Sequence, residues 1–306
     1  MKIKILSMAR AEKGTANLPA QFNEPVRQDL IKRAVLAIYA NSRQPYGADP
    51  EAGKKSHAKL SRRRRAYKGS YGHGISRVPR KIMSRSGTQF NWTGAFSPNT
   101  VGGRRAHPPK AEKIWKQKVN KKENRKAIRS AIAATLIKHL VESRGHRVPS
   151  EYPFVVESKI ESISKTKDLV SALEKLGFGD ELARADRKIR AGKGKSRGRK
   201  YKKTRGMLIV FSNDCPLRKA ANSILGVEAV GIKCINAETL APGAIPGRMT
   251  IFTEGAIELM EKEKLFTEEM KKPEKIAKKS EEAAKKVPEK PAKKEAKKSA
   301  RKVPKK

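Results

Sequence analysis

The side chains best suited to chemistry in this sequence are arginines, lysines and aromatic residues gathered in one internal stretch, residues 45–119. Arg62, Arg63, Arg64 and Arg65 form a run of four guanidinium groups, each able to bind a phosphate bidentately or to stack on a base. Downstream aromatic rings alternate with further basic residues: Tyr67, Tyr71, Phe90, Trp92 and Phe96 with Lys68, Arg77, Arg80, Lys81 and Arg85. Four arginines alone also fit a solvated charge cluster or a targeting signal. The interleaved aromatics favour stacking on unpaired RNA bases.

The same stretch has too few apolar residues to build a core. Residues 45–119 hold 18 Lys or Arg and 3 acidic residues. From Ser61 to Lys110, Ile, Leu and Val together occur four times. That apolar content cannot offset the conformational entropy of ordering the segment. Because compact domains seldom carry so long an insert without a functional reason, we predict an extended RNA-binding arm that a polyanion orders.

Positive charge is concentrated in three segments of the 306-residue chain, whose formal net charge is +42. Residues 45–119 contribute +15, residues 187–205 contribute +11 and residues 271–306 contribute +11, leaving +5 on the other 176 residues. Clustered charge of this kind indicates nucleic-acid binding. A membrane partner is disfavoured, because no basic segment has an apolar helical face and no run is long enough for a transmembrane helix or a signal peptide.

The second basic segment, residues 187–205, has no acidic residue to balance its charge. It directly precedes a strongly apolar run, Met207 to Phe211, so we predict a phosphate-binding loop at the edge of a sheet. Its candidate RNA-binding residues are Arg190, Lys193, Lys195, Arg197, Arg199, Lys200, Lys202, Lys203 and Arg205.

Outside the basic segments, short apolar runs alternate with helical periodicity. Strands are expected at 2–6, 154–156, 207–211, 227–235 and 248–252, and helices at 26–40, 121–143, 165–176, 180–190 and 254–265. The pattern predicts an α/β fold with a doubly wound, mostly parallel sheet and helices on both faces. We expect one domain over 1–265 that contains the arm 45–119 and the loop 187–205, followed by a disordered Lys/Ala/Glu/Pro tail over 266–306.

Enzyme signatures fail at each position tested. A phosphate loop ending at Gly194-Lys195-Ser196 would need a glycine at Ile189, and dinucleotide fingerprints would need glycines at Arg77 or Arg197. The five histidines lack zinc-site spacing, and His139 fits a core or edge position. Cys215 and Cys234 are interpreted as reduced core thiols. We therefore predict no enzyme activity, no cofactor and no metal.

Several segments, in the same order along the chain, match the sequence of one known family. They are YGHGISRVPR at 71–80, KVN at 118–120, SAIAAT at 130–135, RGHRV at 144–148, PFVVESKIESISKTKDLVSALEKLG at 153–177, AGKGKSRGRKYKKTRG at 191–206 and LAPGAIPGR at 240–248. Over about residues 1–265 the chain closely resembles the fourth protein of the large ribosomal subunit, in its archaeal and eukaryotic form.

The resemblance implies an α/β domain on the subunit surface, and an arm that threads through ribosomal RNA to form part of the polypeptide exit tunnel wall. It places the arm's tip near Lys68 to Arg85. The tunnel-tip candidates are Tyr71, Gly72, His73, Gly74 and Arg77, and the RNA clamps include Arg62 to Arg65, Arg104, Arg105 and Trp115. One departure is KIM at 81–83, where relatives usually have a glycine run.

The partners implied are large-subunit rRNA, neighbouring ribosomal proteins including the other protein of the tunnel constriction, and the nascent peptide, but not a second copy of the chain. The expected role is structural, in subunit assembly and in the tunnel wall of cytoplasmic ribosomes. The alternative is a non-ribosomal protein that condenses nucleic acid, which the Lys-Ala-Pro tail would fit. A cofactor-binding enzyme is a third class, disfavoured by the missing fingerprints.

Overall fold

A computed structural model describes residues 1–267. The described chain divides into two compact units, one of residues 1–32 and 120–267 and one of residues 33–119. The division falls within helix α1 (Gln28–Asn41), and the second unit contains the whole of the predicted arm. The predicted tail lies mostly outside the described residues, since only 266 and 267 are included. Within residues 1–267, no helix is both long enough and apolar enough to cross a membrane.

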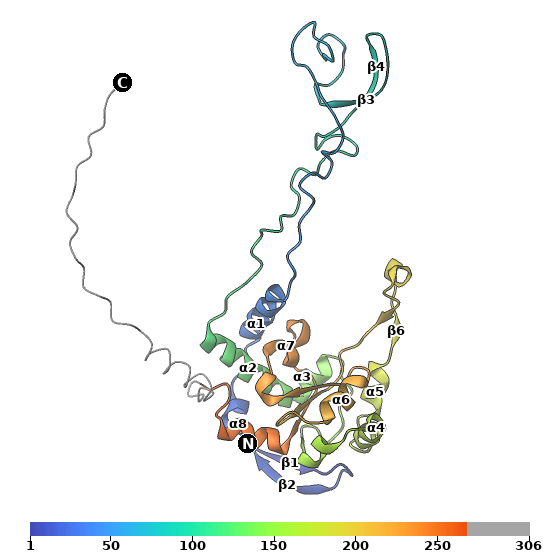
Figure 1. Ribbon diagram of the computed structural model, residues 1–306. Helices are drawn as coiled ribbons and strands as arrows, with labels where there is room; N and C mark the ends of the chain where they lie inside the picture. The colour runs from blue at the N-terminus through green and yellow to red at the C-terminus, as the bar shows by residue number, and fades with distance from the viewer. Residues whose placement is uncertain (268–306) are drawn as a thin grey trace, which may run out of the picture. The chain divides into compact units, whose positions relative to one another are not determined.

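The first unit is built on a six-stranded sheet whose strands follow the order β2-β1-β5-β10-β8-β9 (Figure 1). Its strands are β1 (Lys2–Leu6), β2 (Glu12–Asn17), β5 (Val155–Val156), β8 (Leu208–Phe211), β9 (Glu228–Gly231) and β10 (Thr250–Thr253). Only β2 is antiparallel to its neighbour. The predicted mostly parallel α/β sheet is therefore confirmed. The polar sequence of β2 gave no strand signal, and its pairing with β1 was missed.

Helices cover both faces of this sheet. They are α2 (Lys121–Leu136), α3 (Lys138–Ser143), α4 (Thr166–Lys175), α5 (Gly179–Ala185), α6 (Leu217–Ser223), α7 (Ala237–Leu240) and α8 (Glu254–Lys262), with 3-10 turns at Ala20–Asn23, Ser158–Ser162, Ile232–Cys234 and Pro242–Ala244. Helices α4 and α6 pack together on one face, and α2 and α7 pack together on the other (Figure 1).

Strand β8 shows why a continuous apolar run was the strongest strand signal. Ile209 and Phe211 join the core cluster of α4 and α6, whereas Leu208 and Val210 point to the opposite face because strand side chains alternate. All four residues are buried, with at most 2 % of their surface exposed. A strand covered on both faces needs apolar residues at every position, unlike an edge strand such as β2.

Helix α4 ends as the sequence predicts. Gly177 has φ +90°, its amide donates to the Glu174 carbonyl at 2.9 Å, and the Phe178 amide donates to the Leu173 carbonyl at 3.0 Å. These two bonds form a Schellman cap, and the accompanying contact between Leu173 and Phe178 is part of the core.

The helix predicted over 121–143 is wrong in one respect, since it is two helices. Ile137 takes an extended conformation between α2 and α3. The Thr135 carbonyl near this break accepts a hydrogen bond from the Tyr152 hydroxyl, so a tertiary contact supplies the donor that a continued helix would have provided. One other expectation also differs, since Cys234 is exposed rather than buried in the core. His139, expected at a core or edge position, is exposed.

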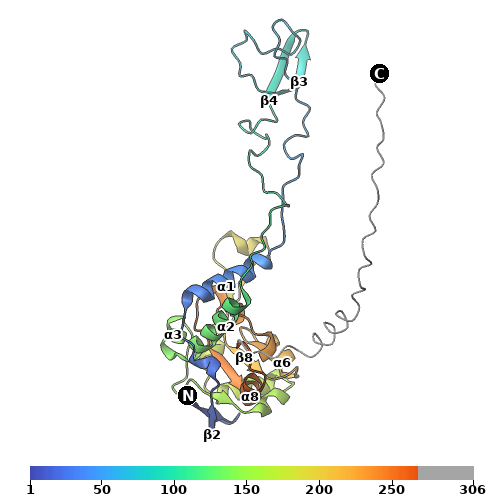
Figure 2. The same ribbon diagram turned by 90° about the vertical axis from the view of Figure 1, so that its left-hand side faces the viewer.

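The second unit holds two long limbs and one β-hairpin, strands β3 (Arg80–Ser86) and β4 (Gln89–Gly94), shown in Figure 2. The limbs lie side by side. The Ala48 amide donates to the Pro109 carbonyl at 3.0 Å, and a Cβ added to Gly53 would lie 2.5 Å from the Arg104 nitrogen. The insert is thus not devoid of secondary structure, although none of its residues belongs to the core cluster of the first unit.

Removing residues 54–103 should leave the first unit folded, because its core is built without them and because Gly53 and Arg104 already lie in contact. With a short Gly-Ser linker in their place, we expect one cooperative thermal transition shifted by no more than about 4 °C, equivalent to about 1 kcal/mol. Circular dichroism and calorimetry would measure it. For scale, Leu173→Ala in the core should cost about 3 kcal/mol. Loss of the cooperative transition on shortening would show that the insert is part of the folding unit.

Candidate nucleic-acid interface

The insert begins and ends at a layered cluster of cationic and aromatic side chains. Tyr46 and Trp115 stack with centroids 5.8 Å apart and an interplanar angle of 18°. The Arg43 guanidinium carbon lies 3.8 Å from the Trp115 ring centroid, and the Lys113 ammonium lies 4.3 Å from the same centroid. Cation–π contacts and stacking hold the two limbs together here without a carboxylate. The predicted clamp residue Trp115 therefore braces the insert itself, which the sequence analysis did not foresee.

Two glycines allow the limbs to approach further along. A Cβ on Gly47 would lie 2.7 Å from the Ala111 nitrogen, and Gly53 combines φ +73° with the close approach to Arg104. Arg104 and Arg105 line a cavity of about 450 Å³ between the limbs. The structure therefore places these two predicted RNA-binding arginines against residues of the opposite limb, in a cavity that is also lined by the carboxylates Asp49 and Glu112.

The four arginines Arg62 to Arg65 lie on a closed loop. Ser61 bridges to Gly69, and the Ser61 amide donates to the Lys68 carbonyl at 3.1 Å. All four arginines are exposed, and residues 52–111 contain no acidic side chain to neutralise them. The loop therefore presents four uncompensated guanidinium groups to solvent, an arrangement suited to phosphate binding.

The hairpin brings together three of the five predicted aromatic residues, Tyr67, Phe90 and Trp92. Phe90 and Trp92 alternate along β4 with exposed neighbours, and their rings stack at 5.2 Å. Tyr67 meets Phe90 edge-on at 5.3 Å and accepts a hydrogen bond of 2.7 Å from Arg85, and the Arg80 guanidinium carbon lies 5.8 Å from the Trp92 centroid. Several predicted RNA-binding residues thus orient one another, and their rings are only partly covered.

Residues 81–83, which read KIM where relatives usually have a glycine run, lie within this hairpin. Lys81 and Ile82 pair with Thr93 and Trp92, and Met83 lies at the irregularity in the register, with 65 % of its surface exposed. The reversal is made by Gly87-Thr88, with φ +56° at Gly87, so a glycine is needed in the turn and not in the preceding strand. Side chains at 81–83 are therefore compatible with an extended backbone.

The tunnel-tip candidates form an open turn beside the hairpin. Gly72 and Gly74 have φ +78° and +65°, and a Cβ at either would meet no atom within 4 Å. Their backbone conformation, and not crowding, favours glycine there. The Arg77 guanidinium carbon lies 4.3 Å from the Tyr71 ring centroid, whereas His73 faces Tyr67 and Trp92 across a cavity.

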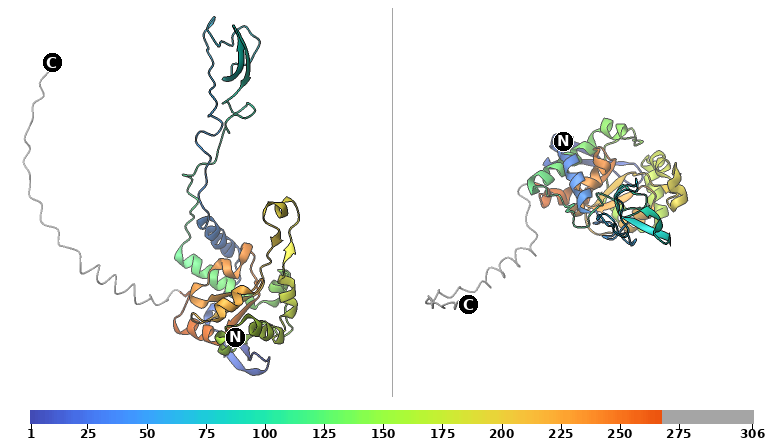
Figure 3. Two further views of the ribbon diagram at one scale, coloured as in Figure 1. Left: turned by 45° about the vertical axis from the view of Figure 1, so that its right-hand side comes forward. Right: turned by 90° about the horizontal axis from the view of Figure 1, so that it is seen from above.

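The second basic segment is an ordered hairpin of the first unit (Figure 3). Strands β6 (Lys188–Ile189) and β7 (Tyr201–Lys202) pair in antiparallel fashion and enclose a 3-10 turn at Lys193–Arg197. The helix predicted over 180–190 is shorter than expected: it ends at Ala185, and strand β6 begins at Lys188. The Arg190 side chain donates back to the Arg199 carbonyl at 3.2 Å, so this predicted RNA-binding arginine also braces its own hairpin. The other candidates of this segment lie on the same hairpin or directly after its second strand.

A buried carboxylate, missed in the sequence analysis, fixes the base of this hairpin. Glu181 binds the His146 ring at 2.7 Å, the Arg147 amide at 3.0 Å and the Arg184 guanidinium at 2.6 Å. Burial alone would raise the pKa of Glu181, but the hydrogen bonds from Arg184, His146 and Arg147 outweigh it and lower that pKa to about 2. Arg184 also donates to the Arg205 carbonyl at 3.1 Å. The Glu-x-x-Arg spacing in α5 was the available sequence signal.

Arg248 is a second residue that was missed from the sequence. It contacts the backbone directly after the 187–205 segment. Its side chain is 1 % exposed and donates to the Gly206 carbonyl at 3.0 Å, the Thr239 carbonyl at 2.7 Å and Glu228 at 2.9 Å. Glu228 also pairs with Arg205 at 3.1 Å. Arg205 is therefore partly neutralised by a carboxylate of the protein itself.

A carboxylate lies where parallel α/β sheets usually bind phosphates. Glu161 lies outside the carboxyl ends of β5, β8 and β10, and accepts hydrogen bonds from the Ser212 amide, the Ser212 hydroxyl and Thr253 at 3.0, 2.7 and 2.6 Å. A carboxylate there uses the donors that a phosphate would need and repels its charge. Within the described residues, no group of three His, Cys, Asp or Glu side chains could hold a metal ion.

Comparison with known proteins decides the family. The sequence model of the Ribosomal protein L4/L1 family matches residues 16–263. The chain belongs to this family. It is 47 % identical over 268 residues to the large ribosomal subunit protein uL4 of Nanoarchaeum equitans, an alignment that spans 87 % of this chain and all of the relative.

Other relatives with the same name are also archaeal. The uL4 protein of Methanocaldococcus jannaschii is 46 % identical over 245 residues, which cover 79 % of this chain and 91 % of that protein. That of Methanococcoides burtonii is 44 % identical over 259 residues, which cover 84 % and 96 %. The resemblance to the archaeal type is confirmed, and family membership makes the chain a ribosomal protein and not an enzyme.

The pKa of Glu181 makes the stability of the first unit depend on pH. Because its folded pKa of about 2 lies below the ordinary value of 4.5, its contribution is complete above about pH 5 and is lost as pH falls toward 2. Glu181→Gln should lower the free energy of unfolding at pH 7 by roughly 3 kcal/mol. It should also flatten the pH dependence between pH 5 and 2. Chemical unfolding across that range would measure both.

The exposed Glu12, which pairs with Lys4, provides the control. Glu12→Gln should leave both the free energy of unfolding and its pH profile nearly unchanged, because exposed ion pairs contribute little. A Glu181→Gln protein with the same acid limb as the unsubstituted chain would contradict the role assigned to this carboxylate.

Proposed function

We propose that the protein is a structural constituent of the large ribosomal subunit, that its insert and its 187–205 hairpin bind ribosomal RNA, and that this binding supports subunit assembly. The single observation that carries the proposal is the charge of the insert. Residues 52–111 hold 15 Lys or Arg and no Asp or Glu, and they include four exposed consecutive arginines. Such a segment needs a polyanion to balance it, and the relatives named above are large-subunit proteins.

Within that function, the tip of the insert contributes to the wall of the polypeptide exit tunnel. The support is local. The two limbs have too few apolar residues to build a core. At their far end lies an open, largely exposed turn that contains Tyr71, Gly72, His73, Gly74 and Arg77. In this proposal the limbs contact RNA, and the turn contacts the nascent peptide and the neighbouring protein of the constriction. Crosslinking from residues 60–110 within purified ribosomes would test the assignment, and crosslinks to other parts of the subunit alone would overturn it.

Neutralising the arginine run should lower both the affinity for large-subunit rRNA and its dependence on salt. Replacing Arg62 to Arg65 by Gln removes up to four phosphate contacts, so the slope of log K against log salt should fall by up to about 3. Filter binding or fluorescence anisotropy at several salt concentrations would measure the change.

The matched control removes the same charge from the tail, by replacing Lys293, Lys294, Lys297 and Lys298 with Gln. It should alter binding much less, because the proposal assigns recognition to the insert. If tail truncation at residue 271 instead abolishes selectivity for rRNA over bulk DNA while the insert is intact, the recognition role assigned to the insert is wrong, and the alternative of a nucleic-acid-condensing protein is favoured.

A further inference from the structure

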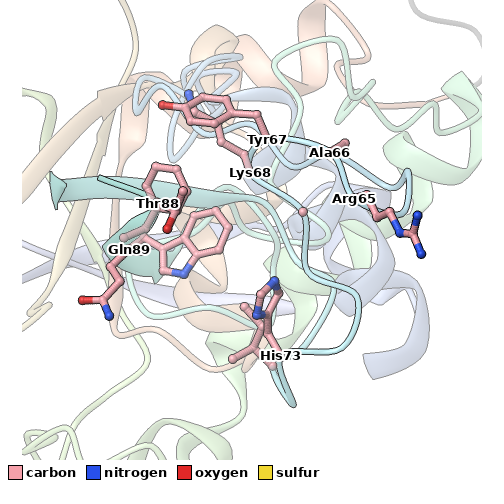
Figure 4. A pocket seen from close by; sticks show the side chains of 11 residues that line it. Arg65, Ala66, Tyr67, Lys68, His73, Thr88 and Gln89 are labelled. Atoms are coloured by element: carbon pink, nitrogen blue, oxygen red, sulfur yellow. The ribbon is translucent and has the colours of Figure 1, made fainter. Parts of the chain in front are cut away.

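A cavity of about 700 Å³ lies within the insert, between the loop of residues 65–69 and the β3–β4 hairpin. Tyr67, Phe90 and Trp92 supply its aromatic walls, and His73, Thr88 and Gln89 supply its polar groups. Figure 4 shows Tyr67 and His73 on different sides of the space, with Thr88 and Gln89 across from Arg65. All of these residues belong to the second unit, so the cavity is complete within it.

The aromatic walls are oriented but not covered. The Tyr67 ring is fixed by its edge contact with Phe90 and by the hydrogen bond from Arg85, yet 59 % of the residue is exposed. Phe90 and Trp92 are only partly buried although they stack on each other. Fixed rings with uncovered surface provide a platform on which another flat, aromatic group can stack without reorganisation of the protein.

The mouth of the cavity carries positive charge held in a strained backbone. Arg65 and Lys68 have φ +53° and +61°, a conformation uncommon for residues with side chains. The loop keeps this geometry through the Ser61–Lys68 and Gly69–Ala66 hydrogen bonds. Figure 4 shows the Arg65 guanidinium extending away from the other labelled side chains, where it can reach a group outside the cavity.

We propose that this cavity receives a single unpaired RNA base, which stacks on Tyr67 while Arg65 and Lys68 bind the flanking phosphates. Thr88 and Gln89 offer donors and acceptors to the edge of the base. The absence of acidic residues from 52–111 selects a polyanionic partner, and the ring walls select one with flat aromatic groups. This inference rests on the proposed RNA-binding function and adds the site at which one nucleotide leaves its stack.

The experiment separates base recognition from phosphate binding. The sequence has two tryptophans, so Trp115→Phe in the full-length chain leaves Trp92 as the only indole reporter. Within that background we compare a short oligoadenylate, an abasic ribose-phosphate strand of equal length and charge, and oligoglutamate. Oligoadenylate should quench Trp92 fluorescence and bind roughly tenfold more tightly than the abasic strand. Quenching by all three polyanions alike, or by none, would overturn the assignment of the cavity.

Substitutions locate the effect. Tyr67→Ala should reduce the preference for oligoadenylate over the abasic strand toward one, whereas Tyr67→Phe, which keeps the ring, should restore it. Tyr67 is exposed, and unchanged circular dichroism would show that the hairpin is intact. Arg105→Gln, outside the cavity, should weaken both strands equally and leave the preference intact. A preference that survives Tyr67→Ala would place base stacking elsewhere.

Failure of this inference differs from failure of the proposed function. Equal binding of both strands, with the arginine-run substitutions still lowering rRNA affinity, would remove the base site and leave the RNA-binding insert in place. Insensitivity of rRNA binding to substitutions throughout the insert would remove both.

Discussion

The positive charge of residues 52–111 is the constraint on which the rest of the structure depends. Sixty successive residues with 15 basic side chains and no acidic ones cannot be neutralised from within. Their mutual repulsion opposes collapse, and their apolar content is too small to overcome it. The segment is therefore held by interactions that tolerate positive charge. Backbone hydrogen bonds join the limbs, glycines let them approach, and aromatic rings accept cations on their faces.

The first unit has a well-packed core, and this core holds both ends of the basic 187–205 hairpin. Two buried networks do this for the 187–205 hairpin. On the N-terminal side of the hairpin, Glu181 binds His146, Arg147 and Arg184. On its C-terminal side, the Arg248 side chain binds the Gly206 carbonyl and the Glu228 carboxylate. A buried carboxylate that binds three partners is costly to disrupt, because removing it leaves the Arg184 guanidinium and a buried backbone amide without this acceptor. These networks give the basic hairpin a fixed base.

At the carboxyl ends of the strands, a side-chain carboxylate lies where doubly wound sheets commonly bind phosphate. In other doubly wound sheets a glycine-rich turn and helix amides bind phosphate there. Here the Glu161 carboxylate accepts the donors at the ends of β8 and β10, and stabilises the packing of the turn that follows β5.

By itself the sequence determined the locations of charge, the core strands and most helices. Their signals are local, such as the apolar run of β8 or Gly177 at the end of α4. Only the tertiary structure decided what depends on distant partners. The strand β2 exists because β1 pairs with it, and the helix after Lys121 breaks at Ile137 where Tyr152 reaches Thr135. Glu181 and His146 meet across 35 positions of sequence, and no periodicity encodes such a contact. The aromatic residues of the insert were found as a pattern, but their assembly around one cavity required the hairpin register that places Trp92 opposite Ile82.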